Sequence, residues 1–253
     1  MPMTDRPTRR ILFIGIILRF LERYFFDPKL KESLVLALKE SKVAGKHSAV
    51  DEVVCFDIGA NRGQTIRLFK EIFPNCKIYA FEPHPNIFRT LISSYKLGKG
   101  VKCFNLAVGE LSGKFPFWVS PLDEASSMHL PDPDSTWNRK KALILGIDPK
   151  KMYKKIDVEV VTLDEFTSQH GIQTIDILKI DVEGGELQVL LGSRSIFQED
   201  RVSIVQYESH EDDLRPSQQI QIETFLTEYG FVEYSNIKHA FGDFSDKIFI
   251  KRA

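Results

Sequence analysis

The sequence predicts an α/β fold in which a mostly parallel sheet is covered by helices on both faces. From about residue 52 onward, short apolar runs rich in Val, Ile and Phe alternate with stretches of helical apolar spacing. This alternation is typical of β-α-β units, whose crossovers are right-handed. The last two apolar runs, 231–237 and 246–252, are separated by a loop alone. They are expected to form an antiparallel hairpin at one edge of the sheet.

The composition is that of a globular protein. Of the 253 residues, 43% are hydrophobic and 27% are charged, and the net charge is −1. This balance lacks the positive excess typical of nucleic-acid-binding surfaces. The cysteines Cys55, Cys76 and Cys103 are widely spaced and stand in apolar runs. We interpret them as buried thiols, which favours a reducing, cytoplasmic compartment.

Residues 1–45 are predicted to be a helical extension of the main domain. The apolar run 11–18 follows three arginines and is too short to span a bilayer. No small-x-small cleavage site follows it, so a cleaved signal is the weaker interpretation. Two interpretations stay open. The first helix either lies on a membrane surface as an amphipathic helix, giving peripheral membrane contact, or packs on the body or on a second subunit, giving a homo-oligomer.

Further elements follow in order along the chain. "TLDEF" carries a capping box, Thr162 with Glu165, and therefore opens a helix. The segment 121–155 breaks the alternation with four prolines, a tryptophan and a basic cluster, and we interpret it as a lid-like insertion. The predicted helices before the capping box cover 29–45, 65–73 and 86–98, and the predicted strands cover 52–57, 77–82, 101–108, 156–161, 175–181, 202–208, 231–237 and 246–252.

The stretch Asp57–Gly63, with the pattern D-x-G-x-N-x-G, joins the first strand to its helix. Ligands of an open parallel sheet bind at this carboxyl edge, and glycines let the backbone approach them closely. A dinucleotide site would favour G-x-G-x-x-G, but here an acid stands where a phosphate would be repelled. S-adenosylmethionine has no phosphate and carries an ammonium group, so it fits the loop better. The alternative is an ordinary turn in which Asp57 only caps the helix.

Acids end three more of the predicted strands. Glu82 ends the second strand, where a carboxylate can hold the two hydroxyls of a ribose. Asp181 and Glu208 end two later strands, and His210 follows Glu208. Because the carboxyl ends of parallel strands meet at one edge, we expect the acids to line one pocket.

Four motifs resemble one known family. "FDIGANRG", "FEPHP", "VTLDEF" and "DILKIDVEGGELQVLLG", in this order, are similar to the FkbM-type S-adenosylmethionine-dependent methyltransferases over roughly Val53 to Glu208. The resemblance implies a doubly wound, seven-stranded, Rossmann-like methyltransferase domain over 46–253. It also implies methyl transfer to a hydroxyl, often of a sugar, a glycan or a natural product. The predicted cofactor-binding residues are Asp57, Gly59, Ala60, Asn61, Gly63, Thr65, Glu82, Asn105 and Asp181.

Methyl transfer to an alcohol requires that the alcohol lose its proton, so a base is expected at the same edge of the sheet. Glu208 is the preferred base, with Asp181 and His210 as the other candidates. A divalent metal held by Asp181 and Glu208, as in catechol-type methyltransferases, is an alternative that two acids alone do not favour. Lys179 either contacts substrate or pairs with Asp181. The predicted substrate-contacting residues are Ser126, Ser127, Lys179, Glu183 and His239.

Two other functions use the same topology. A nicotinamide-dependent oxidoreductase would need the additional glycine in the first loop. A non-catalytic nucleoside-binding module would keep the loop and lose the acids at the edge, and here the acids are present. The sequence therefore favours a methyltransferase that acts on a small-molecule or glycan hydroxyl.

Overall fold

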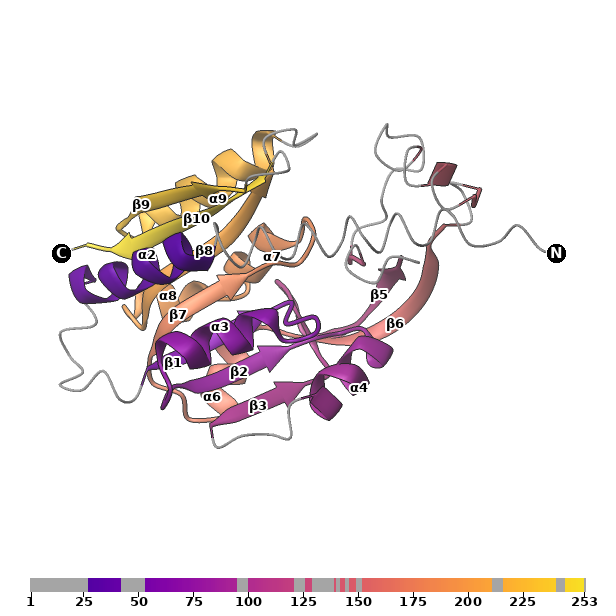
Figure 1. The fold of residues 1–253 in the computed structure, drawn as a ribbon, viewed down its shortest axis with the longest axis horizontal. Helices are drawn as coiled ribbons and strands as arrows, with labels where there is room; N and C mark the ends of the chain where they lie inside the picture. Colours follow the sequence, from indigo (N-terminus) through magenta and orange to yellow (C-terminus); the bar gives the residue numbers. More distant parts are fainter. Residues whose placement is uncertain are drawn as a thin grey trace.

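The computed structural model describes residues 27–41, 53–94, 100–120, 126–128, 139, 142–143, 146–148, 152–210, 216–239 and 244–252 (Figure 1). Seven strands form the main sheet: β1 (Val54–Ile58), β2 (Lys77–Phe81), β3 (Val101–Phe104), β7 (Ile175–Ile180), β8 (Val202–His210), β9 (Phe231–Lys238) and β10 (Phe244–Lys251). Their order is β3-β2-β1-β7-β8-β10-β9. The predicted seven-stranded, mostly parallel sheet is confirmed.

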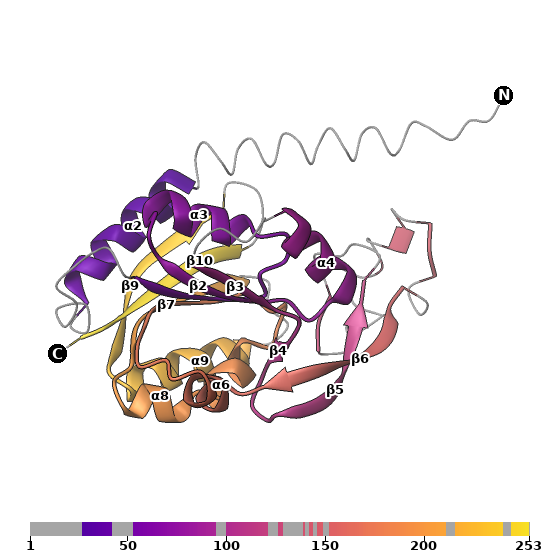
Figure 2. The ribbon, with the colours of Figure 1, turned by 90° about the horizontal axis from the view of Figure 1, so that it is seen from below.

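Helices cover both faces of this sheet, as a doubly wound fold requires. Figure 2 shows α2 (Asp27–Glu40), α3 (Gln64–Ile72) and α4 (Pro85–Ser94) on one face. The opposite face carries α6 (Leu163–Gln169), α7 (Glu186–Leu191), α8 (Arg194–Gln198) and α9 (Pro216–Glu228).

Successive strand residues serve the two faces in turn, because side chains alternate along a strand. In β7, Ile177 packs in the cluster beneath α2 and α3, and Leu178 packs in the cluster beneath α6 to α9. Every residue of β7 is buried. A strand covered on both faces therefore appears in the sequence as an apolar run without alternation, and in β7 the exceptions are Asp176 and Lys179.

The C-terminal hairpin is confirmed, with one feature that the sequence did not indicate. β10 pairs antiparallel with β9 and also with β8, so it lies between them and β9 is the edge strand. The register places Asp246 of β10 opposite Glu208 of β8. Because the last strand inserts beside β8, the start of β10 lies at the same sheet edge as the end of β8.

A second sheet of three strands stands beside the first. It contains β4 (Ala107–Val108), β5 (Gly113–Val119) and β6 (Lys154–Val161), in the order β4-β6-β5. The prediction of one strand over 101–108 is wrong, because the chain leaves the main sheet at Asn105. The amide of Asn105 donates to the carbonyls of Glu82 (2.8 Å) and Pro83 (3.0 Å), which ties this turn to the end of β2. β5 was not predicted. It contains Pro116, which an edge strand tolerates.

The predicted capping box at α6 is half confirmed. The Thr162 hydroxyl accepts from the Glu165 amide at 3.1 Å, as expected. The second contact of a capping box, from the Thr162 amide to the Glu165 carboxylate, is indirect. Ser112 Oγ accepts from the Thr162 amide (3.0 Å) and donates to the Glu165 carboxylate. A side chain from the loop before β5 thus completes the cap.

The N-terminal predictions are met only in part by the described residues. α2 confirms the helix that was predicted from residue 29. The apolar run 11–18 and most of the predicted lid over 121–155 lie outside the described residues. Where helices are described, none is both long enough and apolar enough to cross a membrane.

Gly192, at the end of α7, provides a test of how the two sheets are joined. A Cβ at this position would lie 2.0 Å from the carbonyl oxygen of Gly109, which follows β4. We expect Gly192→Ala to lower the free energy of unfolding by about 3 kcal/mol, because overpacking forces the backbone apart. Urea denaturation measures the change. Gly171→Ala is the control: its Cβ would meet nothing within 4 Å, and its φ of +64° leaves a penalty of about 1 kcal/mol. Equal losses for the two variants would contradict the close contact.

Candidate functional site

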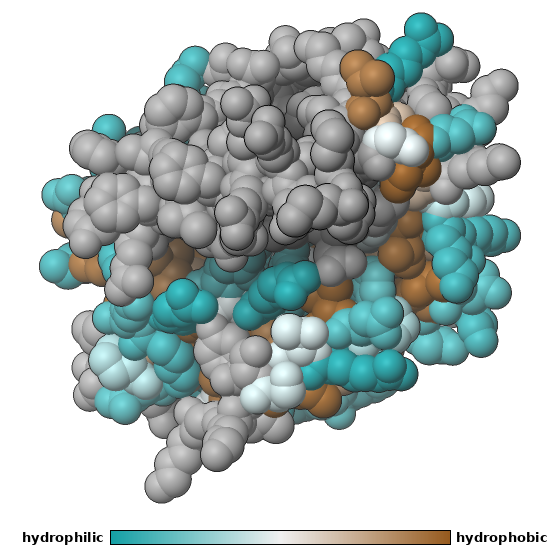
Figure 3. Space-filling model, turned by 45° about the vertical axis from the view of Figure 1, so that its right-hand side comes forward, coloured by the Kyte–Doolittle hydropathy of each residue, from teal (hydrophilic) through white to brown (hydrophobic). Residues whose placement is uncertain are grey.

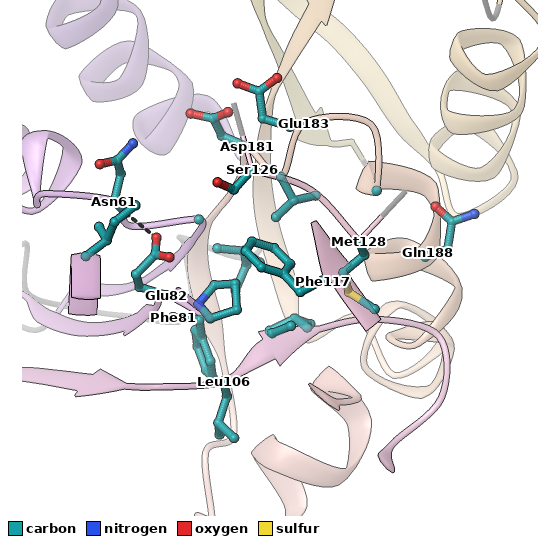
Figure 4. A pocket seen from close by; sticks show the side chains of 18 of the residues that line it. Asn61, Phe81, Glu82, Leu106, Phe117, Ser126, Met128, Asp181, Glu183 and Gln188 are labelled. Carbon is teal, nitrogen blue, oxygen red and sulfur yellow. Dashed lines mark hydrogen bonds between the residues drawn. The ribbon is translucent and has the colours of Figure 1, made fainter. Parts of the chain in front are cut away.

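A cavity of about 320 Å³ lies at the carboxyl edge of the main sheet. Its walls come from the ends of β1, β2, β7 and β8 on one side and from β4 and β5 on the other (Figure 4). The volume falls within the usual range for a small-molecule site. Of the residues predicted from the sequence, those that line the cavity are Gly59, Asn61, Glu82, Ser126, Asp181, Glu183 and Glu208.

The loop after β1 is shaped by backbone contacts to the neighbouring strands. The amides of Gly59 and Ala60 both donate to the Phe81 carbonyl, at 3.0 and 2.9 Å. The Asp181 amide donates to the Ile58 carbonyl at 2.9 Å. Gly59 has a φ of +86°, and a Cβ there would lie 1.8 Å from the Asp181 carbonyl oxygen. Glycine at residue 59 is therefore required for the β1 loop to cross the end of β7.

Glu82 lies almost completely buried at the end of β2. Its two carboxylate oxygens accept from the amides of Asn61 (2.9 Å) and His84 (2.8 Å), and the first of these bonds is drawn in Figure 4. Burial raises the pKa of Glu82 to about 7, although the two amide hydrogen bonds oppose the rise. The carboxylate is thus fixed in orientation at the wall of the cavity.

Asp57 and Lys179 lie behind the wall instead of lining it. Lys179 Nζ is 3.0 Å from Asp181 Oδ2 and 3.4 Å from Asp57 Oδ1. Burial raises the pKa of Asp57, and Lys179 opposes this. Burial disfavours the charged form of Lys179, but the carboxylates of Asp181 and Asp57 outweigh it and raise the pKa of the lysine. The interpretation that Lys179 pairs with Asp181 is confirmed.

The loop after β7 is held from within and from outside. Glu186 Oε1 accepts from the amides of Val182 (3.3 Å) and Gly184 (3.1 Å). Ser127 Oγ donates to the Glu183 carbonyl at 2.9 Å, and Glu183 has a φ of +56°. Ser127 therefore supports the loop, whereas its neighbour Ser126 lines the cavity.

The candidate bases differ in their placement. Glu208 lines the cavity and is half-buried. His210 ends β8, and the structure describes its backbone only. His239 does not reach the cavity: its Nε2 lies 2.9 Å from Asp246 Oδ2, and its ring packs at 4.1 Å from that of Phe244. Within the described ranges, no group of three or more acids, histidines and cysteines is arranged to hold a metal ion.

The structure does not bring all of the predicted residues to the cavity. Those that lie behind it or beside it are Asp57, Ala60, Gly63, Thr65, Asn105, Ser127, Lys179 and His239. Conversely, the sequence did not indicate the apolar wall formed by Leu106, Val108, Phe117 and Met128, or the amide of Gln188. Gln188 carried one signal, because it stands within the motif "DILKIDVEGGELQVLLG".

The described part of the protein surface is mixed in character. In the view of Figure 3, hydrophobic side chains reach the surface between hydrophilic ones. The most exposed large apolar side chains among the described residues are Leu143 and Leu111, which come from separate segments. The cavity is therefore the feature of the described surface that best fits a small-molecule site.

A doubly wound sheet with a ligand cavity at its carboxyl edge defines the Rossmann-like class, and comparison with known proteins identifies the family. The model of the methyltransferase FkbM domain matches residues 57–233. The chain therefore belongs to the FkbM methyltransferase family.

Relatives within this family are distant. The chain is 25% identical over 159 residues to the 2-O-methyltransferase NoeI of Sinorhizobium fredii, covering 62% of this chain and 64% of that protein. It is 29% identical over 157 residues to the 31-O-demethyl-FK506 methyltransferase FkbM of Streptomyces tacrolimicus, covering 55% and 58%.

A solved structure, methyltransferase FkbM from Methylobacillus flagellatus KT, has the same fold at a TM-score of 0.52. Sequence identity is 14%, and the match covers 85% of this chain and 47% of that one. The chain thus spans about two thirds of NoeI and about half of the solved relative. The family match and the solved structure therefore give the family and the fold of this chain.

The raised pKa of Glu82 predicts how stability depends on pH. The folded-state pKa of about 7 exceeds the ordinary value of 4.5 for a glutamate, so the folded protein binds an additional proton between these pH values. The Glu82 contribution to stability is therefore present at pH 4.5 and lost as the pH rises to 7. It amounts to on the order of 2 kcal/mol.

Urea denaturation at pH 5 and pH 7.5 measures this difference. In Glu82→Ala the decrease between the two pH values should shrink by that amount. An unchanged decrease would show that Glu82 titrates normally.

Proposed function

We propose that this protein transfers a methyl group from S-adenosylmethionine to a hydroxyl of a sugar, a glycan or a natural product. The observation that carries the proposal is the charge of the cavity. Its described lining includes four carboxylates, Glu82, Asp181, Glu183 and Glu208, and no lysine, arginine or histidine. Such a wall repels phosphate and attracts a cation, which favours a sulfonium cofactor over a nicotinamide dinucleotide.

The residues present fit this cofactor. Two buried side-chain oxygens at the lining, Asn61 Oδ1 and Gln188 Oε1, have no hydrogen-bond partner among the described residues. Buried acceptors in a ligand site are normally satisfied when the ligand is bound. Glu82 would hold the ribose hydroxyls, and Asp181 would face the ammonium group. When bound, S-adenosylmethionine supplies a methyl group that is electrophilic because it is attached to a sulfonium sulfur.

The remaining tasks fall to the chain itself. The apolar side chains Leu106, Phe117 and Met128 would exclude water from the cavity. Glu208 would accept the proton of the acceptor hydroxyl. It lies two residues before the end of β8, at the cavity wall, and stands opposite Asp246 of β10 in the strand register. The acceptor oxygen would then take the methyl group that the bound cofactor supplies, while Glu208 holds the proton.

The names of the two relatives support transfer to oxygen. One is a 2-O-methyltransferase and the other is a 31-O-demethyl-FK506 methyltransferase. Both names describe methylation of a hydroxyl, and this is the basis for proposing O-methylation here. Membership of a methyltransferase family leaves the oxidoreductase alternative without support.

The proposed function is tested directly by methyl transfer. We expect the purified protein to bind S-adenosylhomocysteine in calorimetry and not NADH. We also expect it to transfer tritium from methyl-labelled S-adenosylmethionine to a component of a glycan or lipid extract. Binding of NADH without binding of S-adenosylhomocysteine would reject the proposal.

Glu82→Ala tests the ribose assignment. Above pH 7, where Glu82 is mostly charged, a charged acceptor is worth about 1.5–3 kcal/mol per hydrogen bond, so affinity for S-adenosylhomocysteine measured there should fall at least tenfold. Glu199→Ala is a suitable control, because Glu199 is exposed and pairs with Arg201 away from the cavity. Unchanged affinity in Glu82→Ala would assign the ribose to another residue.

Glu208→Gln tests the base. The substitution keeps the shape of the side chain and removes its basicity, so turnover should fall by about 10²–10⁴-fold. Cofactor affinity should change little. Full turnover in this variant, together with a loss in His210→Gln, would identify the histidine as the base. Loss of activity in a chelator, restored by magnesium, would instead point to metal ligation by Asp181 and Glu208.

A further inference from the structure

Lys179 stands between one carboxylate at the cavity wall and one behind it. β1 and β7 pair with Asp57 opposite Lys179, so the two side chains share a face of the sheet. The side chain of Asp57 is completely buried, that of Lys179 is 10% exposed and that of Asp181 is 34% exposed. The three charged side chains therefore form a row in which exposure to solvent increases from the interior to the cavity.

This row explains why a lysine is buried here at all. A carboxylate removed from water is strongly destabilising unless a cation compensates it. Among the described residues, Lys179 is the one cation in ion-pair distance of Asp57. It also donates to Asp181 Oδ2 at 3.0 Å, which leaves Asp181 Oδ1 available to a ligand.

The same geometry excludes two other roles for Lys179. Its side chain does not line the cavity, so it is not placed to contact a substrate. Two neighbouring carboxylates hold it in the protonated form, so it is not a proton acceptor. Its effect on the site must pass through Asp181.

We propose that Lys179 is a positioning residue that fixes the Asp181 carboxylate for the ligand, and that Asp57 is the buried countercharge of Lys179 and does not itself contact the ligand. The second half departs from the sequence-based prediction, which made Asp57 a cofactor-binding residue. The proposal rests on the proposed function to the extent that the ligand is S-adenosylmethionine or its product.

A second buried lysine provides a matched control. Lys247 on β10 is also buried between two carboxylates, with Nζ 2.6 Å from Glu223 Oε1 and 3.5 Å from Glu233 Oε2. None of these three residues lines the cavity. Lys247→Met therefore removes a similar ion pair without touching the Asp181 carboxylate.

The stability of four variants separates pairing from ligand binding. Lys179→Met leaves Asp57 buried without a cation and should lower the melting temperature by about 10 °C. The double variant D57N/K179M removes both charges and should recover most of that loss. Asp57→Asn and Lys247→Met complete the set.

Affinity for S-adenosylhomocysteine, measured by calorimetry, tests the positioning role. The double variant D57N/K179M should bind at least tenfold more weakly than D57N, which keeps the contact from Lys179 to Asp181. Lys247→Met should bind within about twofold of the unchanged protein whatever its melting temperature. Equal affinity of D57N and D57N/K179M for S-adenosylhomocysteine would overturn the proposal, whether both variants keep the affinity of the unchanged protein or both lose it.

Crystal structures of D57N and D57N/K179M provide a readout that needs no ligand. Asp181 should keep its side-chain orientation in the first and change it in the second. An unchanged Asp181 in the double variant would overturn the positioning role. Failure of the unchanged protein to bind S-adenosylhomocysteine would reject the proposed function, while the two crystal structures would still decide the role of Lys179.

Discussion

The crossing of the β1 loop over the end of β7 is the constraint on which the site depends. The Asp181 carbonyl lies so close to Gly59 that a Cβ would be 1.8 Å from its oxygen. The Asp181 amide bonds to Ile58, which fixes the two strand ends together. From this crossing the Asn61 amide reaches Glu82, so one contact places residues from β1, β2 and β7 around the same space. A side chain at residue 59 would separate these three strand ends at once.

The buried acids at this edge of the sheet differ in what stabilises their charge. The fully buried Asp57 pairs with a cation, whereas Glu82 has only backbone amides to stabilise its charge. Burial raises the pKa of both acids, to about 7 for Glu82, because neither the two backbone amides nor the ammonium group of Lys179 fully offsets the cost of desolvation. Hydroxyl groups of a ligand would supply the missing hydrogen bonds.

The sequence predicted the main sheet well, because its strands are buried on both faces and appear as continuous apolar runs. The small sheet was predicted poorly for two local reasons. The run 101–108 is interrupted by only two polar residues, Lys102 and Asn105, so its pattern does not show that Asn105 turns the chain away from β2. β5 contains Pro116, which argues against a strand unless the strand is known to lie at an edge. Because β4 and β5 provide the apolar wall, these two errors removed Val108 and Phe117 from the predicted site.

The acids at the strand ends were predictable, but their partners were not. A motif shows that Asp57, Asp181 and Glu208 lie at one edge, and only the register shows that Asp57 faces Lys179 across two strands. The same register places Gln206 beside Lys179, and Gln206 donates to Asp246 at 2.7 Å. Asp246 in turn holds His239, so His239 belongs to the hairpin end of this edge and not to the cavity.

The polar residues along this edge form two separate units. Gln206 Oε1 has no hydrogen-bond partner among the described residues, and Lys179 donates to Asp181 instead. The ion pairs around Lys179 are therefore not continued by hydrogen bonds to the pair formed by Asp246 and His239. One unit is tied to the cavity through Asp181, and the other stabilises the strand that inserts between β8 and β9. Because only electrostatic interaction links them, a change in the His239 charge reaches the cavity weakly, whereas a change at Lys179 reaches it through a direct contact.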